Sequence, residues 1–126
     1  MARRRIPVSE GQAALRAWVT APDRTALDRA TLATAVRHTV AELGEAAPGR
    51  SVELRVPPFA AVQCVTGPVH SRGTPPAVIE TDPQTWLAVA VGDLTWAVGV
   101  DEGRIRVSGQ RTDLSAWLPL AADTSS

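Results

Sequence analysis

The sequence has no lysine, asparagine or tyrosine, and it has only one cysteine, one methionine and one phenylalanine in 126 residues. A single cysteine leaves no disulfide to form within the chain, and no cysteine or histidine pair has the spacing of a zinc site. No apolar run approaches the ~20 residues that a membrane-spanning helix needs. These absences favour a cytoplasmic protein with no dedicated metal site and no integral membrane segment.

Charge is balanced over the whole chain but not along it. Thirteen arginines offset thirteen acidic residues, so the net charge gives no reason to expect nucleic acid as a partner. Residues 1–50 carry a net charge of +3 (eight Arg, five acids), and residues 51–126 carry −3 (five Arg, eight acids). We interpret residues 1–8, with Arg3 to Arg5, as a flexible basic arm in solvent. The exclusive use of arginine indicates a GC-rich genome and favours an actinobacterial source.

The first third of the chain predicts two helices. Ser9 and Gln12 have the spacing of a capping box, which predicts a short helix ending near residue 21. A longer helix starts within residues 23–28, because apolar residues then recur every three or four positions at Leu32, Val36, Val40 and Leu43. His38 falls on the flank of this stripe, where we expect a boundary or solvated side chain.

From residue 51 the apolar period changes to two, which is typical of strands. Residues 51–56 alternate as a half-buried strand should, and Pro57-Pro58 ends that strand because proline has no N–H to donate. Two further segments read as a hairpin partner and a third strand, residues 59–67 and 77–82. The loop between them is rich in proline and glycine.

The last third predicts short helices around one more strand. Asp82-Pro83 is a strong helix start, Thr95 caps a second helix and Asp113 caps a third, which ends near Leu120. Residues 104–109 alternate as a strand. The order is α-α-β-β-β-α-α-β-α, so we expect an α+β domain over residues 9–120, followed by a polar tail, 121–126. Its small, mainly antiparallel sheet would have about four to five strands, with helices over one face.

No segment carries a catalytic motif or a dinucleotide-binding glycine pattern, so we predict a non-enzyme without a cofactor. Cys64 shares a strand face with Val62, and a small strand cysteine of this kind is expected to be a buried, inert thiol. His70, Ser71 and Arg72 lie together in one loop. They are either solvated or placed to contact a carboxylate, a phosphate head group or a protein partner.

Four tryptophans remain to be explained in a chain with so few other aromatic residues. Each falls on a predicted helix, where core packing is the simplest interpretation: Trp18, Trp86, Trp96 and Trp117. Three of these helices are about two turns long. Short helices of this kind can lie over one face of a sheet and leave an apolar cavity beneath them.

The C-terminal third resembles the sterol carrier protein family, the small lipid-binding α+β fold of the type-two sterol carriers. The matching features are a Gly92-Asp93-Leu94 step, the Trp96 helix, the strand "GRIRVSG" and the closing segment "DLSAWLPL". With "VPPFAAVQC" and "RGTPPAVIETDP", the resemblance extends over residues 6–120 and is closest to a stand-alone actinobacterial branch. It implies an apolar tunnel lined and covered by Trp96, Ile105, Val107, Leu114 and Trp117.

These observations together predict a non-catalytic carrier for an apolar small molecule such as a fatty acyl, isoprenoid or sterol-like lipid. Alternation adds Val62 and Cys64 to the cavity lining, and His70 and Arg72 are candidate head-group or partner contacts. The alternative is a protein-interaction or homodimerisation module of the same fold with a filled cavity. The sequence leaves the ligand and the oligomeric state open.

Overall fold

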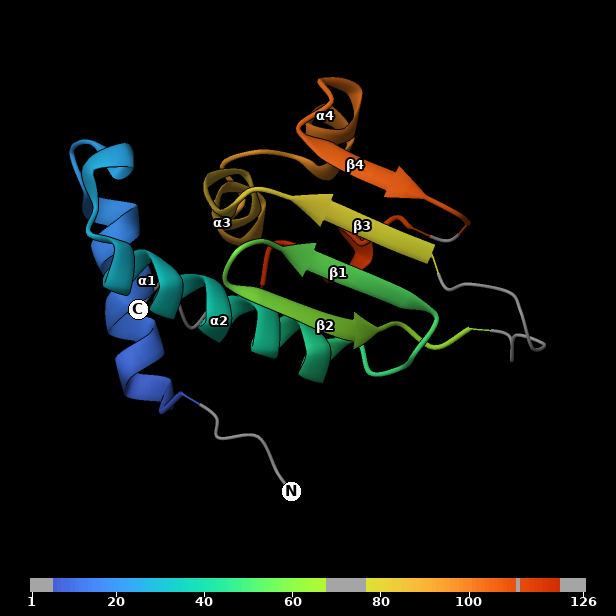
Figure 1. The fold of residues 1–126 in the computed structure, drawn as a ribbon, viewed down its shortest axis with the longest axis horizontal. Helices are drawn as coiled ribbons and strands as arrows, with labels where there is room; N and C mark the ends of the chain where they lie inside the picture. Colours follow the sequence, from blue (N-terminus) through green and yellow to red (C-terminus); the bar gives the residue numbers. More distant parts are fainter. Residues whose placement is uncertain (1–5, 68–76, 111, 121–126) are drawn as a thin grey trace.

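A computed structural model describes residues 6–67, 77–110 and 112–120, and it shows one small α+β domain (Figure 1). The predicted order of elements is confirmed as far as the fourth strand. In chain order the helices are α1 (Val8–Thr20), α2 (Arg29–Ala46), α3 (Pro83–Val91) and α4 (Trp96–Asp101), with single 3-10 turns at Arg24–Ala26 and Ser115–Trp117. The strands are β1 (Val52–Val56), β2 (Ala60–Cys64), β3 (Ala77–Thr81) and β4 (Ile105–Ser108).

The expected last helix is wrong: residues 115–117 form one 3-10 turn only. Asp113 does accept a hydrogen bond from the Ser115 N–H at 2.9 Å, so the predicted cap is present. The helix stops because Leu118 is extended, with ψ at 144°, as is favoured for a residue before proline. The chain then continues as an extended segment whose Leu120 N–H donates to the Ala90 carbonyl of α3.

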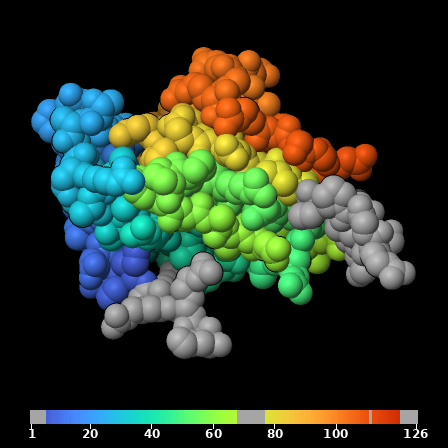
Figure 2. Space-filling view, viewed as in Figure 1, coloured from blue at the N-terminus to red at the C-terminus, as the bar shows by residue number. Residues whose placement is uncertain are grey.

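The sheet has the strand order β2-β1-β3-β4, with antiparallel pairs at both edges and one parallel pair, β1 with β3, in the centre. The prediction of a mainly antiparallel sheet is therefore confirmed. One cross-strand row on the helix-covered face consists of Val62, Leu54, Ile79 and Val107. The other face carries Glu53, Arg55 and Glu80, and no helix covers it in the view of Figures 1 and 2.

The two N-terminal helices pack against each other, and this contact corrects the expectation for His38. Its side chain is only 4% exposed. A Cβ on Gly11 of α1 would lie 2.3 Å from the His38 Cγ, so α1 approaches this flank of α2 through a glycine. The predicted capping box is also wrong, since α1 begins at Val8 and no side chain caps it. Ser9 is thus already inside the helix.

Candidate functional site

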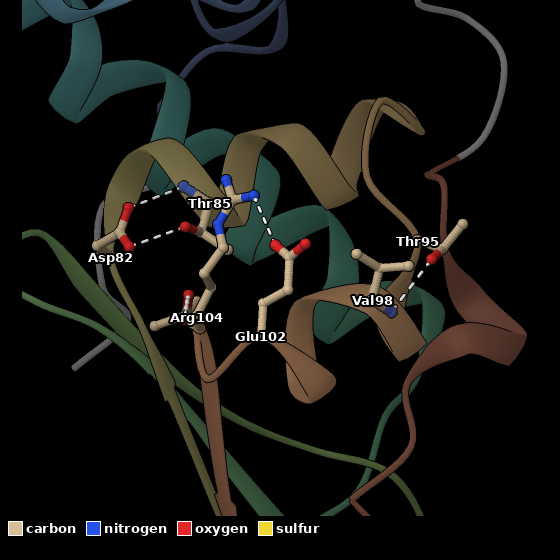
Figure 3. Close-up of polar contacts among 7 residues, drawn as sticks. Asp82, Thr85, Thr95, Val98, Glu102 and Arg104 are labelled. Atoms are coloured by element: carbon tan, nitrogen blue, oxygen red, sulfur yellow. Dashed lines mark hydrogen bonds and ion pairs between the residues drawn. The ribbon is translucent and has the colours of Figure 1, made fainter.

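Capping residues that can be recognised in the sequence determine where α3 and α4 begin and where α3 ends. Gly92 ends α3 in the left-handed conformation, with φ at 91°, which glycine adopts at little cost. The hydroxyl of Thr95 then accepts a hydrogen bond from the Val98 N–H at 3.2 Å and caps α4 (Figure 3). Asp82 caps α3 in the same way, with its two oxygens on the N–H and hydroxyl of Thr85. These caps fix where both short helices start.

Helix α4 lies directly on β4, at the edge of the sheet. A Cβ on Gly99 would be 2.5 Å from the Cδ1 of Ile105, so only glycine permits this approach. The Arg104 N–H donates to the Gly99 carbonyl at 3.0 Å, and the Thr81 hydroxyl donates to the Arg104 carbonyl at 2.7 Å. The Arg104–Glu102 ion pair is long, 3.4 Å, and exposed (Figure 3), so it adds little. Backbone and packing contacts therefore hold α4 against β4.

A pocket of about 400 Å³ opens between α4, β4 and the segment at residues 112–115. Its apolar wall consists of Trp96, Ala97, Val100 and Val107. Its polar residues are Thr95, Asp101, Thr112, Asp113 and Ser115. Hydrogen bonds from Ser115 lower the pKa of Asp113 below its usual 3.8, so this carboxylate is charged at neutral pH. The pocket thus combines an apolar wall with a polar, negatively charged part.

The predicted site residues divide between this pocket and the core. Trp96 and Val107 line the pocket, although Trp96 is itself only 8% exposed. Ile105 lies beneath α4 at 2% exposure, and Leu114 is fully buried. Trp117 is half-buried and packs against the core. Two of the five predicted residues therefore face the pocket, and the other three belong to the core or pack against it.

Val62 and Cys64 share the helix-covered face but lie on β2, at the opposite edge of the sheet from β4. Three strand spacings separate the two edges, about 14 Å. Gly44 of α2 lies over Val62, where an added Cβ would be 2.9 Å from its Cγ2. Cys64 is fully buried, as expected, and burial raises its pKa to about 11, which favours the protonated thiol at neutral pH. His70 and Arg72 lie outside the described residues.

Sequence reasoning missed most of the pocket's lining. Ala97, Val100 and Asp101 follow from the helical period once α4 is known to lie on β4, since residues three and four apart share a face. Thr112, Asp113 and Ser115 line the pocket from the segment that follows β4. No periodic signal marks such a segment.

The centre of the domain, between sheet and helices, is filled by side chains. The largest residues with no exposed surface include Trp86, Leu43, Leu54, Ile79 and Leu87. The Trp86 Nε1 donates to the Thr39 hydroxyl at 2.8 Å, so the buried indole has its polar partner. Among the described residues, no cluster of His, Cys, Asp or Glu fits a metal ion. Nor does any helix in that part of the chain have the length and apolarity to cross a membrane.

Comparison with known proteins places this fold in a family. A search of curated proteins gives no match. A protein-family model described as "Bacterial SCP ortholog" matches residues 28–120, which run from the Asp28 cap of α2 to Leu120. Helix α1 lies before the matched region, whereas the whole sheet and the pocket lie within it. Because the match covers well over half of the sequence, this chain belongs to the bacterial SCP orthologues, a sterol carrier protein-like family.

Proposed function

We propose that the chain is a small, non-catalytic cytoplasmic protein that holds an apolar ligand in the pocket between α4 and β4. Fatty acyl, isoprenoid and sterol-like molecules are the candidate ligands. The observation that carries this proposal is the pocket itself, about 400 Å³ with tryptophan and aliphatic side chains on one wall. Ligand pockets in proteins have volumes of roughly 300–1,000 Å³ and mainly apolar linings with a few polar groups. Membership of the sterol carrier-like family supports the same function.

The polar part of the pocket favours one kind of ligand head group. Asp101 and Asp113 both line it, and Asp113 is held in its charged form by Ser115. A free carboxylate on the ligand would be repelled by these groups, whereas a hydroxyl can donate a hydrogen bond to them. We therefore expect long-chain alcohols and sterol-like alcohols to bind more tightly than fatty acids of the same length.

Apolar burial is the driving force that we propose for such binding. A hydrocarbon chain that buries about 300 Å² gains ~7 kcal/mol at ~25 cal/mol per Å². Losses of translational and conformational freedom reduce this gain, so micromolar affinity is the upper range. This is adequate for a carrier, which must also release its ligand.

Two exposed valines provide a matched test of the site. Val107 is 39% exposed and lines the pocket, whereas Val98 is 42% exposed and does not. Val107→Arg puts a charge into the apolar wall and should weaken binding of a fluorescent long-chain alcohol at least about tenfold. Val98→Arg adds the same charge and should change affinity by less than about twofold. Energy transfer from tryptophan to the ligand, with circular dichroism as a fold check, measures both.

Native mass spectrometry of the purified protein identifies the natural ligand class. A bound apolar molecule that is present on the native protein and absent from Val107→Arg supports the proposed site. Equal binding by the two arginine variants would refute the placement of the ligand against Val107. A protein that stays empty after incubation with a lipid mixture would refute the carrier function.

The exposure of Val98 and Val107 next to the β4 edge also supports the alternative, a protein-interaction or homodimerisation module. In that case Val98→Arg should reduce self-association as well as Val107→Arg. Light scattering coupled to gel filtration over a range of protein concentrations distinguishes the two functions. A monomer at all concentrations argues against homodimerisation.

A further inference from the structure

The turn that joins β1 to β2 presents apolar surface to solvent. Pro57 and Pro58 are exposed, and Phe59 is half-buried. The Phe59 N–H donates to the Val56 carbonyl at 3.0 Å, which closes the turn. Figure 1 shows this turn beside α2, at the end of the sheet where β1 finishes. This turn, which we call the tip, therefore exposes apolar surface next to a helix.

Two arginines of α2 lie around the ring of Phe59. The guanidinium carbons of Arg29 and Arg37 are 5.1 and 5.9 Å from the ring centroid. The Arg37 Nε also donates to the Phe59 carbonyl at 3.2 Å. Both arginines are exposed, and neither makes an ion pair with a carboxylate of the described residues. Their charges are held at the apolar tip and are available to a partner.

The acidic groups of the neighbouring elements are already engaged. The carboxylate of Asp28 accepts hydrogen bonds from the Thr31 N–H and hydroxyl at 3.0 and 2.9 Å. On the open face of the sheet, two carboxylates are paired with arginines: Glu53 with Arg55 at 2.9 Å, and Glu80 with Arg106 at 2.7 Å. The pairs on the sheet are neutral as units, but Asp28 keeps its negative charge because its hydrogen bonds favour the ionised form. Arg29 and Arg37 therefore outweigh Asp28 by two positive charges to one and give the surface at the tip a small positive excess.

We propose that this tip, Pro57 to Phe59 with Arg29 and Arg37, is a docking surface for membranes that contain anionic phospholipids. Apolar side chains flanked by arginines suit the boundary between head groups and acyl chains, where the exposed Pro57 and Pro58 face the apolar side and the guanidinium groups contact phosphate. The tip lies beside the β2 edge, whereas the pocket lies at the β4 edge. The protein can thus contact a membrane without covering the pocket, and the proposal does not depend on what the pocket binds.

Vesicle flotation with the full chain tests this surface. We expect binding to phosphatidylcholine vesicles only when phosphatidylglycerol is added. Each arginine near an anionic surface contributes about fivefold in affinity, so Arg29→Gln with Arg37→Gln should weaken binding about 25-fold. Raising the salt concentration to about 1 M should abolish binding, because the Debye length falls to about 3 Å.

A charge-matched variant controls for nonspecific attraction. Arg16 and Arg50 are exposed and have no carboxylate partner among the described residues. Arg50 precedes β1 and donates to the Gln63 side chain at 3.3 Å, at the end of β1 and β2 opposite the tip. Arg16→Gln with Arg50→Gln should change vesicle binding by less than about twofold. Circular dichroism and thermal unfolding establish that both double variants fold.

Three results would overturn the proposal. One is equal loss of binding in the two double variants, and another is no binding of the native chain to vesicles with phosphatidylglycerol. The third is binding of soluble glycerol phosphate without any vesicle binding, which would make the arginines a site for a free anion. Ligand binding in the pocket is measured without vesicles, so each proposal can fail while the other stands.

Discussion

The contact between α4 and β4 leads to a quantitative prediction for Gly99→Ala. The added Cβ would lie 2.5 Å from the Cδ1 of Ile105 and 3.0 Å from its Cγ1. Ile105 is 2% exposed and has little space in which to move its terminal methyl. Overpacking of this kind costs about 1–3 kcal/mol, while alanine in place of helical glycine gains about 1 kcal/mol. We expect Gly99→Ala to lower the free energy of unfolding by about 1 kcal/mol.

A double-mutant cycle isolates the clash from the propensity effect. Ile105→Val removes the atom closest to the new methyl and alone costs about 0.5–1.5 kcal/mol. Combined with Gly99→Ala, it should cost at least about 1 kcal/mol less than the sum of the single changes. Urea unfolding followed by tryptophan fluorescence measures all four proteins.

The control for this cycle is Gly103→Ala. Gly103 has φ at 74° and no atom within 4 Å of an added Cβ, so alanine there meets backbone strain but no Ile105 side chain. Its cost should be unchanged by Ile105→Val. Additivity within about 0.5 kcal/mol for the Gly99–Ile105 pair would refute the close approach of α4 to β4.

Three further predictions concern single groups. Thr95→Ala removes the cap of α4 and should cost about 1 kcal/mol in urea unfolding, whereas Thr95→Ser should cost much less. Cys64 is buried, with a pKa of about 11, so it should react with a thiol reagent at pH 8 only through opened states, and the logarithm of the labelling rate should fall linearly as the free energy of unfolding rises. Hydrogen bonds from Thr31 lower the pKa of Asp28 below 3.8; its ionised form therefore stabilises the fold above that pH, and this contribution is lost as pH falls through the lowered value. Asp28→Asn should flatten the acid limb of the stability–pH curve.

Much of the fold could be predicted because its signals are local. The caps at Asp82 and Thr95 depend on a hydroxyl or carboxylate and an N–H three residues later, and both form as expected. The alternation in β1 likewise reports which side chains face the core, since Val52, Leu54 and Val56 are all fully buried. An apolar period of two identifies the buried side chains of a strand whenever one face of the sheet is covered and the other is open.

The errors concern features that depend on distant parts of the chain. The sequence predicts a boundary or solvated side chain for His38 on the flank of its helix, but α1 covers that flank because Gly11 lets the two helices approach closely. A glycine inside a helical pattern was the available signal for such an approach. The closing helix failed because Pro119 disfavours helical backbone at Leu118, and the extended segment is then held by α3 through Leu120.

Knowing which face of the sheet a side chain occupies is not enough to place it in the candidate site. Alternation places Val62 and Val107 on the same face, and the structure puts them in one cross-strand row. What distinguishes them is the element above each strand: α2 closes over Val62 through Gly44, whereas Val107 stays 39% exposed beside α4. Strand order and helix placement set this difference, and neither is encoded in a strand's own period. The pocket is therefore found where the helical cover ends, which only the tertiary structure reveals.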